Sequence, residues 1–84
     1  MEREIICKID FGALDQHIYL LENDKTKDLG IANFSNLSNA LVAFCKQTNC
    51  NLVHLYGSND YLEKIVRDIS KINYDNNEIR VEVN

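Results

Sequence analysis

The chain has 84 residues, 45% of them hydrophobic, with a formal net charge of −4 and a pI near 5.0. This length fits one domain, residues 1–84, and the excess of acidic residues argues against a free-standing nucleic-acid-binding protein. The longest apolar run, residues 40–45, is too short to cross a membrane, and the first residues do not resemble a secretion signal. We therefore expect one small cytoplasmic domain without a membrane segment.

The cysteine pattern also favours a cytoplasmic protein. Cys7, Cys45 and Cys50 are odd in number and contain no CxxC spacing, so reduced thiols are expected rather than a disulfide framework. Asparagine occurs eleven times and proline is absent. Together with the many isoleucines, this composition suggests an AT-rich genome, that of a phage or a low-GC bacterium.

The first part of the chain predicts three antiparallel strands. Residues 4–11 alternate apolar and polar positions, and residues 17–22 follow after a loop short enough for a hairpin. Residues 23–28 have the composition of a turn, and residues 29–34 then form a third strand at an edge of the sheet.

A helix and a central strand are expected next. Ser35 or Asn36 can cap a helix that runs to about Thr48, and Asn49 favours its end. Residues 52–56 are apolar on both faces except for His54, as in the middle of a sheet. The buried side of the helix is expected to carry Leu37, Leu41, Phe44, Cys45 and Thr48, with Ala40 beside them.

The last third predicts a second helix and a final strand. Ser58 or Asn59 caps the helix, and residues 73–77 form a turn. Residues 79–83 then alternate, which indicates a strand with one solvated face. The buried stripe of the second helix is expected to be Leu62, Ile65, Val66, Ile69 and Ile72.

The order β-β-β-α-β-α-β predicts an α/β domain with a five-stranded mixed sheet of order 3-2-1-4-5. Both crossovers are right-handed and run in the same direction, so both helices cover one face and leave the other bare. The bare face can recognise a partner or simply contact solvent, as one face of many antiparallel sheets does. Its expected residues are Ile6, Lys8, His54, Tyr56, Arg80 and Glu82, with Asp10 on the same side.

The predicted order, residues 52–62 and the position of Asp10 in Ile9-Asp10-Phe11-Gly12 resemble the core of the ribonuclease H-like superfamily. The resemblance implies a metal-binding carboxylate at Asp10 on the first strand, and Asp60 is placed to assist it. The chain departs from the family pattern because residues 35–49 contain no Asp or Glu and the fourth strand ends without a carboxylate. Two-metal phosphoryl chemistry uses several carboxylates. The resemblance therefore extends to the fold, with an incomplete catalytic set.

The residues of the other candidate sites also have simpler structural explanations. Asp10, Gly57, Ser58 and Asp60 converge where an anion or metal could bind, although strand ends and helix caps use the same residue types. The three cysteines, His17 and His54 match no compact zinc spacing. A solvated, internally paired helix face accounts for Lys64, Arg67 and Lys71 among their acidic neighbours.

The sequence thus favours a non-catalytic protein-interaction module without a cofactor. It would bind a protein partner through the bare face or pair there with itself, and a phage or mobile-element protein acting on a host protein is one concrete form. The alternative is a minimal or degenerate metal-dependent nuclease that uses Asp10 and Asp60 with Mg²⁺ or Mn²⁺.

Overall fold

A computed structural model describes residues 3–10, 12–57, 60–71 and 79–83. Its strands form one five-stranded sheet of order β3-β2-β1-β4-β5, the predicted order. β2 is antiparallel to β1 and β3, whereas β4 is parallel to β1 and β5. The elements are β1 (Arg3–Lys8), β2 (Asp15–Glu22), β3 (Lys25–Asn33), the 3₁₀ turn η1 (Phe34–Asn36), α1 (Leu37–Thr48), β4 (Leu52–Tyr56), α2 (Asp60–Ser70) and β5 (Arg80–Val83).

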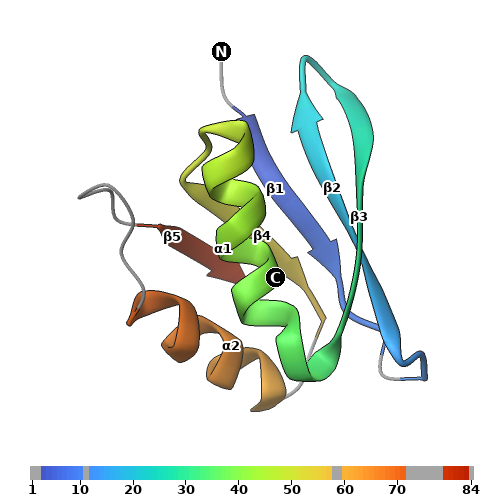
Figure 1. Cartoon of the computed structure of the whole chain (residues 1–84), viewed down its shortest axis with the longest axis vertical. Helices are drawn as coiled ribbons and strands as arrows, with labels where there is room; N and C mark the ends of the chain where they lie inside the picture. The colour runs from blue at the N-terminus through green and yellow to red at the C-terminus, as the bar shows by residue number, and fades with distance from the viewer. Residues whose placement is uncertain (1–2, 11, 58–59, 72–78, 84) are drawn as a thin grey trace.

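Both helices lie on the same side of the sheet, with α1 in front of β1 and β4 and α2 toward β5 (Figure 1). Between helices and sheet is one hydrophobic core, in which each fully buried aliphatic side chain contributes about 1.5–3 kcal/mol to folding. The core side chains of the sheet alternate with those that point away from the helices. The central core residues are Ile5, Cys7, Ile18, Val53 and Leu55 from the sheet, Leu37, Leu41 and Cys45 from α1, and Leu62, Ile65 and Ile69 from α2.

The β2–β3 hairpin is tighter than predicted. Its turn is formed by Asn23 and Asp24 alone, both with positive φ (56° and 61°), and Lys25 already pairs with Glu22. Positive φ at both central residues is the type I′ geometry that matches the twist of paired strands. The predicted six-residue turn is therefore wrong, because polar residues 25–28 belong to an edge strand with little to bury. Charged residues on such an edge also discourage pairing with another sheet.

β3 contains an irregularity opposite Ile18 and Tyr19. Ile18 pairs with Gly30 and Tyr19 with Asp28, so Leu29 is an extra residue on β3. This β-bulge brings Leu29 partly into the core.

The start of α1 also differs from the prediction. Neither Ser35 nor Asn36 caps α1 through its side chain; instead the Oδ1 of Asn33 accepts a hydrogen bond from the Asn36 amide at 3.1 Å, which caps η1. At the other end, Asn49 adopts the left-handed conformation (φ 55°, ψ 45°) and ends the helix as predicted. Val42 joins the buried side of α1, although it was not expected there, and Phe44 is only partly buried.

Three further boundaries need correction. β1 ends at Lys8 rather than residue 11, because the backbone amide and carbonyl of Asp10 form hydrogen bonds with the Gln16 side chain and not with a neighbouring strand. β2 begins at Asp15, two residues earlier than expected. β5 is Arg80–Val83, with Ile79 buried just before it and Val83 46% exposed. The predicted caps Ser58 and Asn59, Ile72 and the turn at 73–77 lie outside the described residues.

Within the part of the chain that the structure describes, neither helix is long and apolar enough to span a bilayer.

Candidate functional site: the open face of the sheet

The strand register brings together the side chains that point away from the helices. Ile6 pairs with His54, and His54 with Glu82; Lys8 pairs with Tyr56. Because paired residues point to the same side, the six residues predicted for this face lie together. We call the surface the open face and define it by Glu4, Ile6 and Lys8 of β1, His17, Tyr19 and Leu21 of β2, Asp28 and Ile31 of β3, Leu52, His54 and Tyr56 of β4, and Arg80 and Glu82 of β5.

Ile6 occupies the middle of the open face. It is only 9% exposed although α1 and α2 both lie on the other side of the sheet (Figure 1), because Tyr19 on one side and His54 on the other pair with it directly. Side chains of directly opposed residues are close enough to cover one another. The centre of the open face is therefore a packed apolar surface flanked by rings.

Two histidine–tyrosine stacks border this centre. The rings of His54 and Tyr56 are 4.8 Å apart at 21°, and those of His17 and Tyr19 are 6.0 Å apart at 15°. A two-residue spacing along a strand places both members of each stack on the same face. Stacked rings of this kind present large, stiff contact surfaces that lose little conformational entropy when a partner binds.

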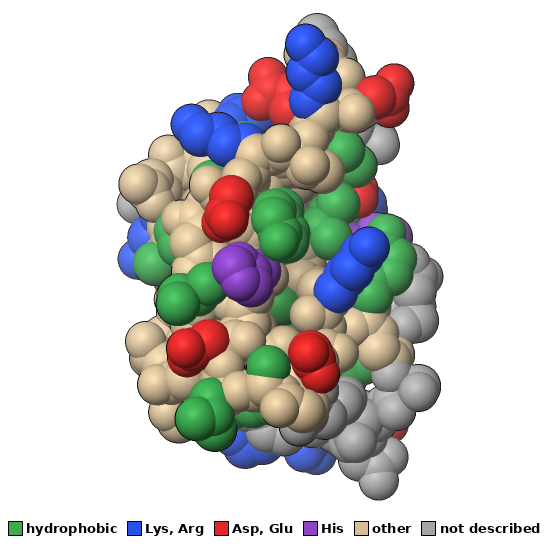
Figure 2. Space-filling model, turned by 90° about the vertical axis from the view of Figure 1, so that its right-hand side faces the viewer, with side chains coloured by type: hydrophobic (Ala, Val, Ile, Leu, Met, Phe, Trp, Pro, Cys, Tyr) green, Lys and Arg blue, Asp and Glu red, His purple; other side chains and the backbone are tan. Residues whose placement is uncertain are grey.

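Several polar side chains of the open face lie in close pairs. His54 Nδ1 lies 3.4 Å from Glu4 Oε1, and both side chains are less than a fifth exposed. At the edges, His17 lies 3.7 Å from Asp28, and Arg80 lies 3.7 Å from Glu82. The view from the β2–β3 side shows histidine, acidic, basic and hydrophobic side chains interspersed, without a continuous patch of one sign (Figure 2).

Glu4, His17 and Tyr19 were not among the residues predicted for the open face. The alternation of His17 and Tyr19 with buried Ile18 and Leu20 was a signal for two of them. Glu4 carried no such signal, because its partner His54 is 50 positions away and only the β1–β4 register brings the two together.

The second predicted site surrounds Asp10. Its carboxylate Oδ1 accepts a hydrogen bond from the Gly12 amide at 2.9 Å, an Asx turn that closes the loop after β1. The Ile9 amide donates to the Tyr56 carbonyl at 2.9 Å, so this loop lies beside the end of β4. Gly57 follows there with φ +154°, and a Cβ at Gly57 would lie 3.5 Å from Ile9 Cβ.

The other members of that predicted site are less completely placed. Ser58 lies outside the described residues, and Asp60 is described only as the first residue of α2, without its side chain. Among the described residues, no three His, Cys, Asp or Glu side chains are grouped as a metal ion would require.

The cysteines occupy structural positions. Burial raises the pKa of both Cys7 and Cys45 to about 12, with nearby Cys50 adding to the rise at Cys45. The Cys50 thiol is also buried and donates to the Arg3 carbonyl at 3.1 Å. Thiols that stay protonated at neutral pH are poor nucleophiles and poor metal ligands. Cys7 and Cys45 therefore act as small apolar groups, and Cys50 is a buried hydrogen-bond donor.

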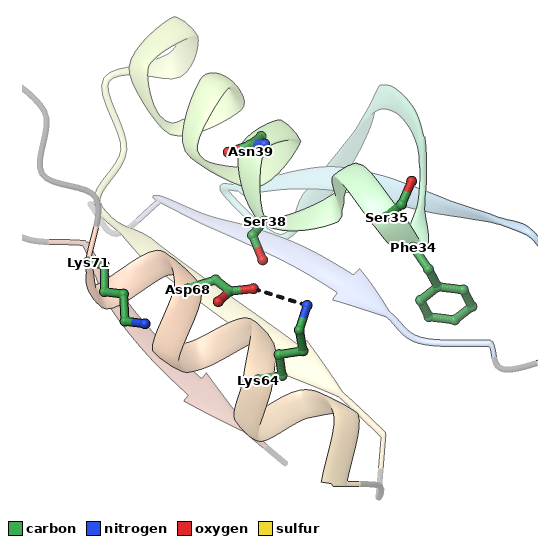
Figure 3. A pocket seen from close by; sticks show the side chains of 7 residues that line it. All are labelled: Phe34, Ser35, Ser38, Asn39, Lys64, Asp68 and Lys71. Atoms are coloured by element: carbon green, nitrogen blue, oxygen red, sulfur yellow. Dashed lines mark ion pairs between the residues drawn. The ribbon is translucent and has the colours of Figure 1, made fainter.

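The helix side carries a shallow polar pocket of about 350 Å³ between the start of α1 and α2 (Figure 3). Lys64 Nζ lies 3.5 Å from Asp68 Oδ2 across one helical turn, one ion pair of the kind predicted for this helix face. In Figure 3 both side chains point toward Ser38, whereas the ring of Phe34 points to the side. The pocket is lined by Phe34, Ser35, Ser38, Asn39, Lys64, Asp68 and Lys71.

No protein-family model matches the chain, and no curated protein matches its sequence.

Proposed function

We propose that this protein is a non-catalytic protein-interaction module that binds its partner through the open face. The observation that carries the proposal is the apolar centre at Ile6, bordered by two histidine–tyrosine stacks on the side of the sheet that faces away from both described helices (Figure 1). Tyrosine rings and buried apolar centres are enriched in protein interfaces, where the surrounding rim is polar.

The charges of the open face favour a protein over a nucleic acid. A nucleic-acid surface needs an excess of lysine and arginine to replace counterions. Here Arg80 lies beside Glu82, and Lys8 is the remaining lysine or arginine of the face, which also carries the acidic residues Glu4 and Asp28. Locally balanced charges instead provide specificity toward a protein surface with matching groups.

A photocrosslinking experiment tests the proposal. A benzophenone amino acid replaces Tyr56 on the open face, and in a second variant it replaces Glu63 on α2, which is exposed on the opposite side. Expressed in bacterial cells and irradiated, the chain labelled at position 56 should crosslink to protein, while the one labelled at 63 should not. Mass spectrometry then identifies the crosslinked chain.

The Tyr56→Asp variant supplies the binding control. Tyr56 is at the open face and outside the core cluster, so the variant should keep the wild-type circular dichroism spectrum and lose capture of the crosslinked protein. Equal crosslinking from positions 56 and 63, or capture by Tyr56→Asp at the wild-type level, would contradict the assignment of binding to the open face.

A further inference from the structure

We propose that the protein bound at the open face is a second copy of this chain, packed face to face about a two-fold axis that crosses β1 at Ile6. This inference rests on the function proposed above. It is carried by the order of side chains along β1, by their neighbours in the sheet and by the size of the face.

Three residues of β1 point to the open face: Glu4 is acidic, Ile6 is apolar and Lys8 is basic. A two-fold axis perpendicular to the strand and lying in the interface places one β1 over the other in the opposite direction. Glu4 of each copy then lies over Lys8 of the other. Between these two contacts, Ile6 of one copy meets Ile6 of the other. Such self-complementarity is what a symmetric dimer interface requires. Packed sheets are about 10 Å apart, which these long side chains can bridge.

The neighbouring strands are compatible with the same axis. On β4, Leu52 and Tyr56 lie on either side of His54, so Leu52 of one copy contacts Tyr56 of the other. Asp28 and Glu82 are aligned with Ile6 across the sheet, through Tyr19 and His54 respectively, and therefore lie on the axis. In the dimer, Asp28 of one copy meets Asp28 of the other at one edge of the face, and Glu82 meets Glu82 at the other edge. The Glu82 charge is compensated within each chain by Arg80, and Asp28 lies 3.7 Å from the His17 ring nitrogen.

The size of the face also suits a dimer. The molecule measures 33 × 28 × 20 Å, and the sheet is parallel to the broad side, because Figure 1 views helices over sheet down the shortest axis. A face of these dimensions can provide the roughly 800 Å² per partner that a standard stable interface buries. The extra burial would add to the limited core of a chain of 84 residues.

Charge reversal tests the geometry. Within one chain Glu4 and Lys8 are about 13 Å apart along the strand, too far for an ion pair. Glu4→Lys and Lys8→Glu each place two like-charge contacts in the dimer, and each should weaken dimerisation about 10-fold or more by sedimentation velocity at low salt. A 1:1 mixture of the two variants restores both contacts and should form a heterodimer of about wild-type affinity. The double variant should likewise dimerise as the wild type does.

Lys71→Glu is the control matched to Lys8→Glu: it makes the same change of net charge on the helix side and should leave dimerisation unchanged. Thermal unfolding checks that each variant is folded, and the mixture keeps the test valid even if Glu4→Lys is less stable. A monomeric wild-type chain at about 200 µM, or a mixture no tighter than its components, would overturn the dimer. If position 56 then crosslinks to a different protein, the open face is still a protein-binding surface, and only the proposal that it binds a second copy of this chain is rejected.

Discussion

Gln16 holds the backbone of Asp10 from both sides. Its Oε1 accepts a hydrogen bond from the Asp10 amide at 2.7 Å, and its Nε2 donates to the Asp10 carbonyl at 2.9 Å. A further hydrogen bond joins Nε2 to the Ala13 carbonyl at 3.1 Å. Gln16 is 1% exposed and is the buried polar side chain among the described residues. One side chain thus ends β1 and shapes the loop into β2.

We expect Gln16→Leu to lower the free energy of unfolding by about 1–3 kcal/mol, because three loop hydrogen bonds are lost while the site stays buried. Gln16→Glu should also destabilise the fold, since a carboxylate cannot donate to the Asp10 carbonyl. Urea unfolding followed by circular dichroism measures both changes.

Gln47→Leu is the matched control, because Gln47 is exposed on α1 and should tolerate leucine within about 0.5 kcal/mol. If Gln16→Leu were as stable as Gln47→Leu, the hydrogen bonds of Gln16 would not be what holds the loop.

The turn between β2 and β3 allows a stabilising substitution. Asp24 has φ +61°, which glycine adopts without steric cost. Asp24→Gly should therefore raise the free energy of unfolding by about 0.5 kcal/mol, a shift of about 2–4 °C in Tm for a domain of this size. Asp24→Ala should lower Tm instead, because alanine lacks the local hydrogen bonding that lets aspartate tolerate this conformation. Equal Tm values for the glycine and alanine variants would rule out the type I′ explanation.

The order of the strands and most of the core could be predicted from the sequence, because buried positions repeat with the period of a strand or a helix. Val53 and Leu55 illustrate this: they alternate with His54 and face the core as expected. The hairpin could not be predicted in this way. Lys25–Asp28 have no apolar pattern, and their strand conformation follows from the turn and from pairing with β2. Tertiary pairing here overrides local composition.

The open face could be predicted only in part, for a related reason. Alternation within β1 and β4 placed Ile6, His54 and Tyr56 on one side, but it could not show which residues are opposite one another. The contact between Glu4 and His54 depends on the β1–β4 register, and the burial of Ile6 depends on Tyr19 from a third strand. Register depends on the hydrophobic patterns of both paired strands and on the geometry of the turns between strands. Pairwise geometry at the site is therefore not contained in any one segment.

Gly30 should be difficult to replace. It lies at the bulge with φ +140°, where a Cβ would meet the Phe44 ring at 3.4 Å. Because that distance is near an ordinary contact, the backbone conformation is the main obstacle, and Gly30→Ala should cost about 1–3 kcal/mol of unfolding free energy. The same cost should persist in a Phe44→Leu background, where the ring is absent. If Phe44→Leu removes the cost, packing against the ring is responsible instead.

The buried thiols predict a loss of stability in alkali. Burial raises the pKa of Cys7 and Cys45 from 9.0 to about 12, so between these values the unfolded chain loses protons that the folded chain retains. Stability is then unaffected below about pH 9 and falls as pH rises toward 12, by about 1.4 kcal/mol per thiol at pH 10. Urea unfolding under reducing conditions at pH 7.5 and pH 10 measures the fall. The Cys7→Ala/Cys45→Ala variant keeps every other titrating group of the wild type. Between pH 7.5 and pH 10 its free energy of unfolding should therefore fall by about 3 kcal/mol less than that of the wild type, whatever the stability of the variant at pH 7.5. An equal fall in both proteins would show that the folded state exposes these thiols to ionisation.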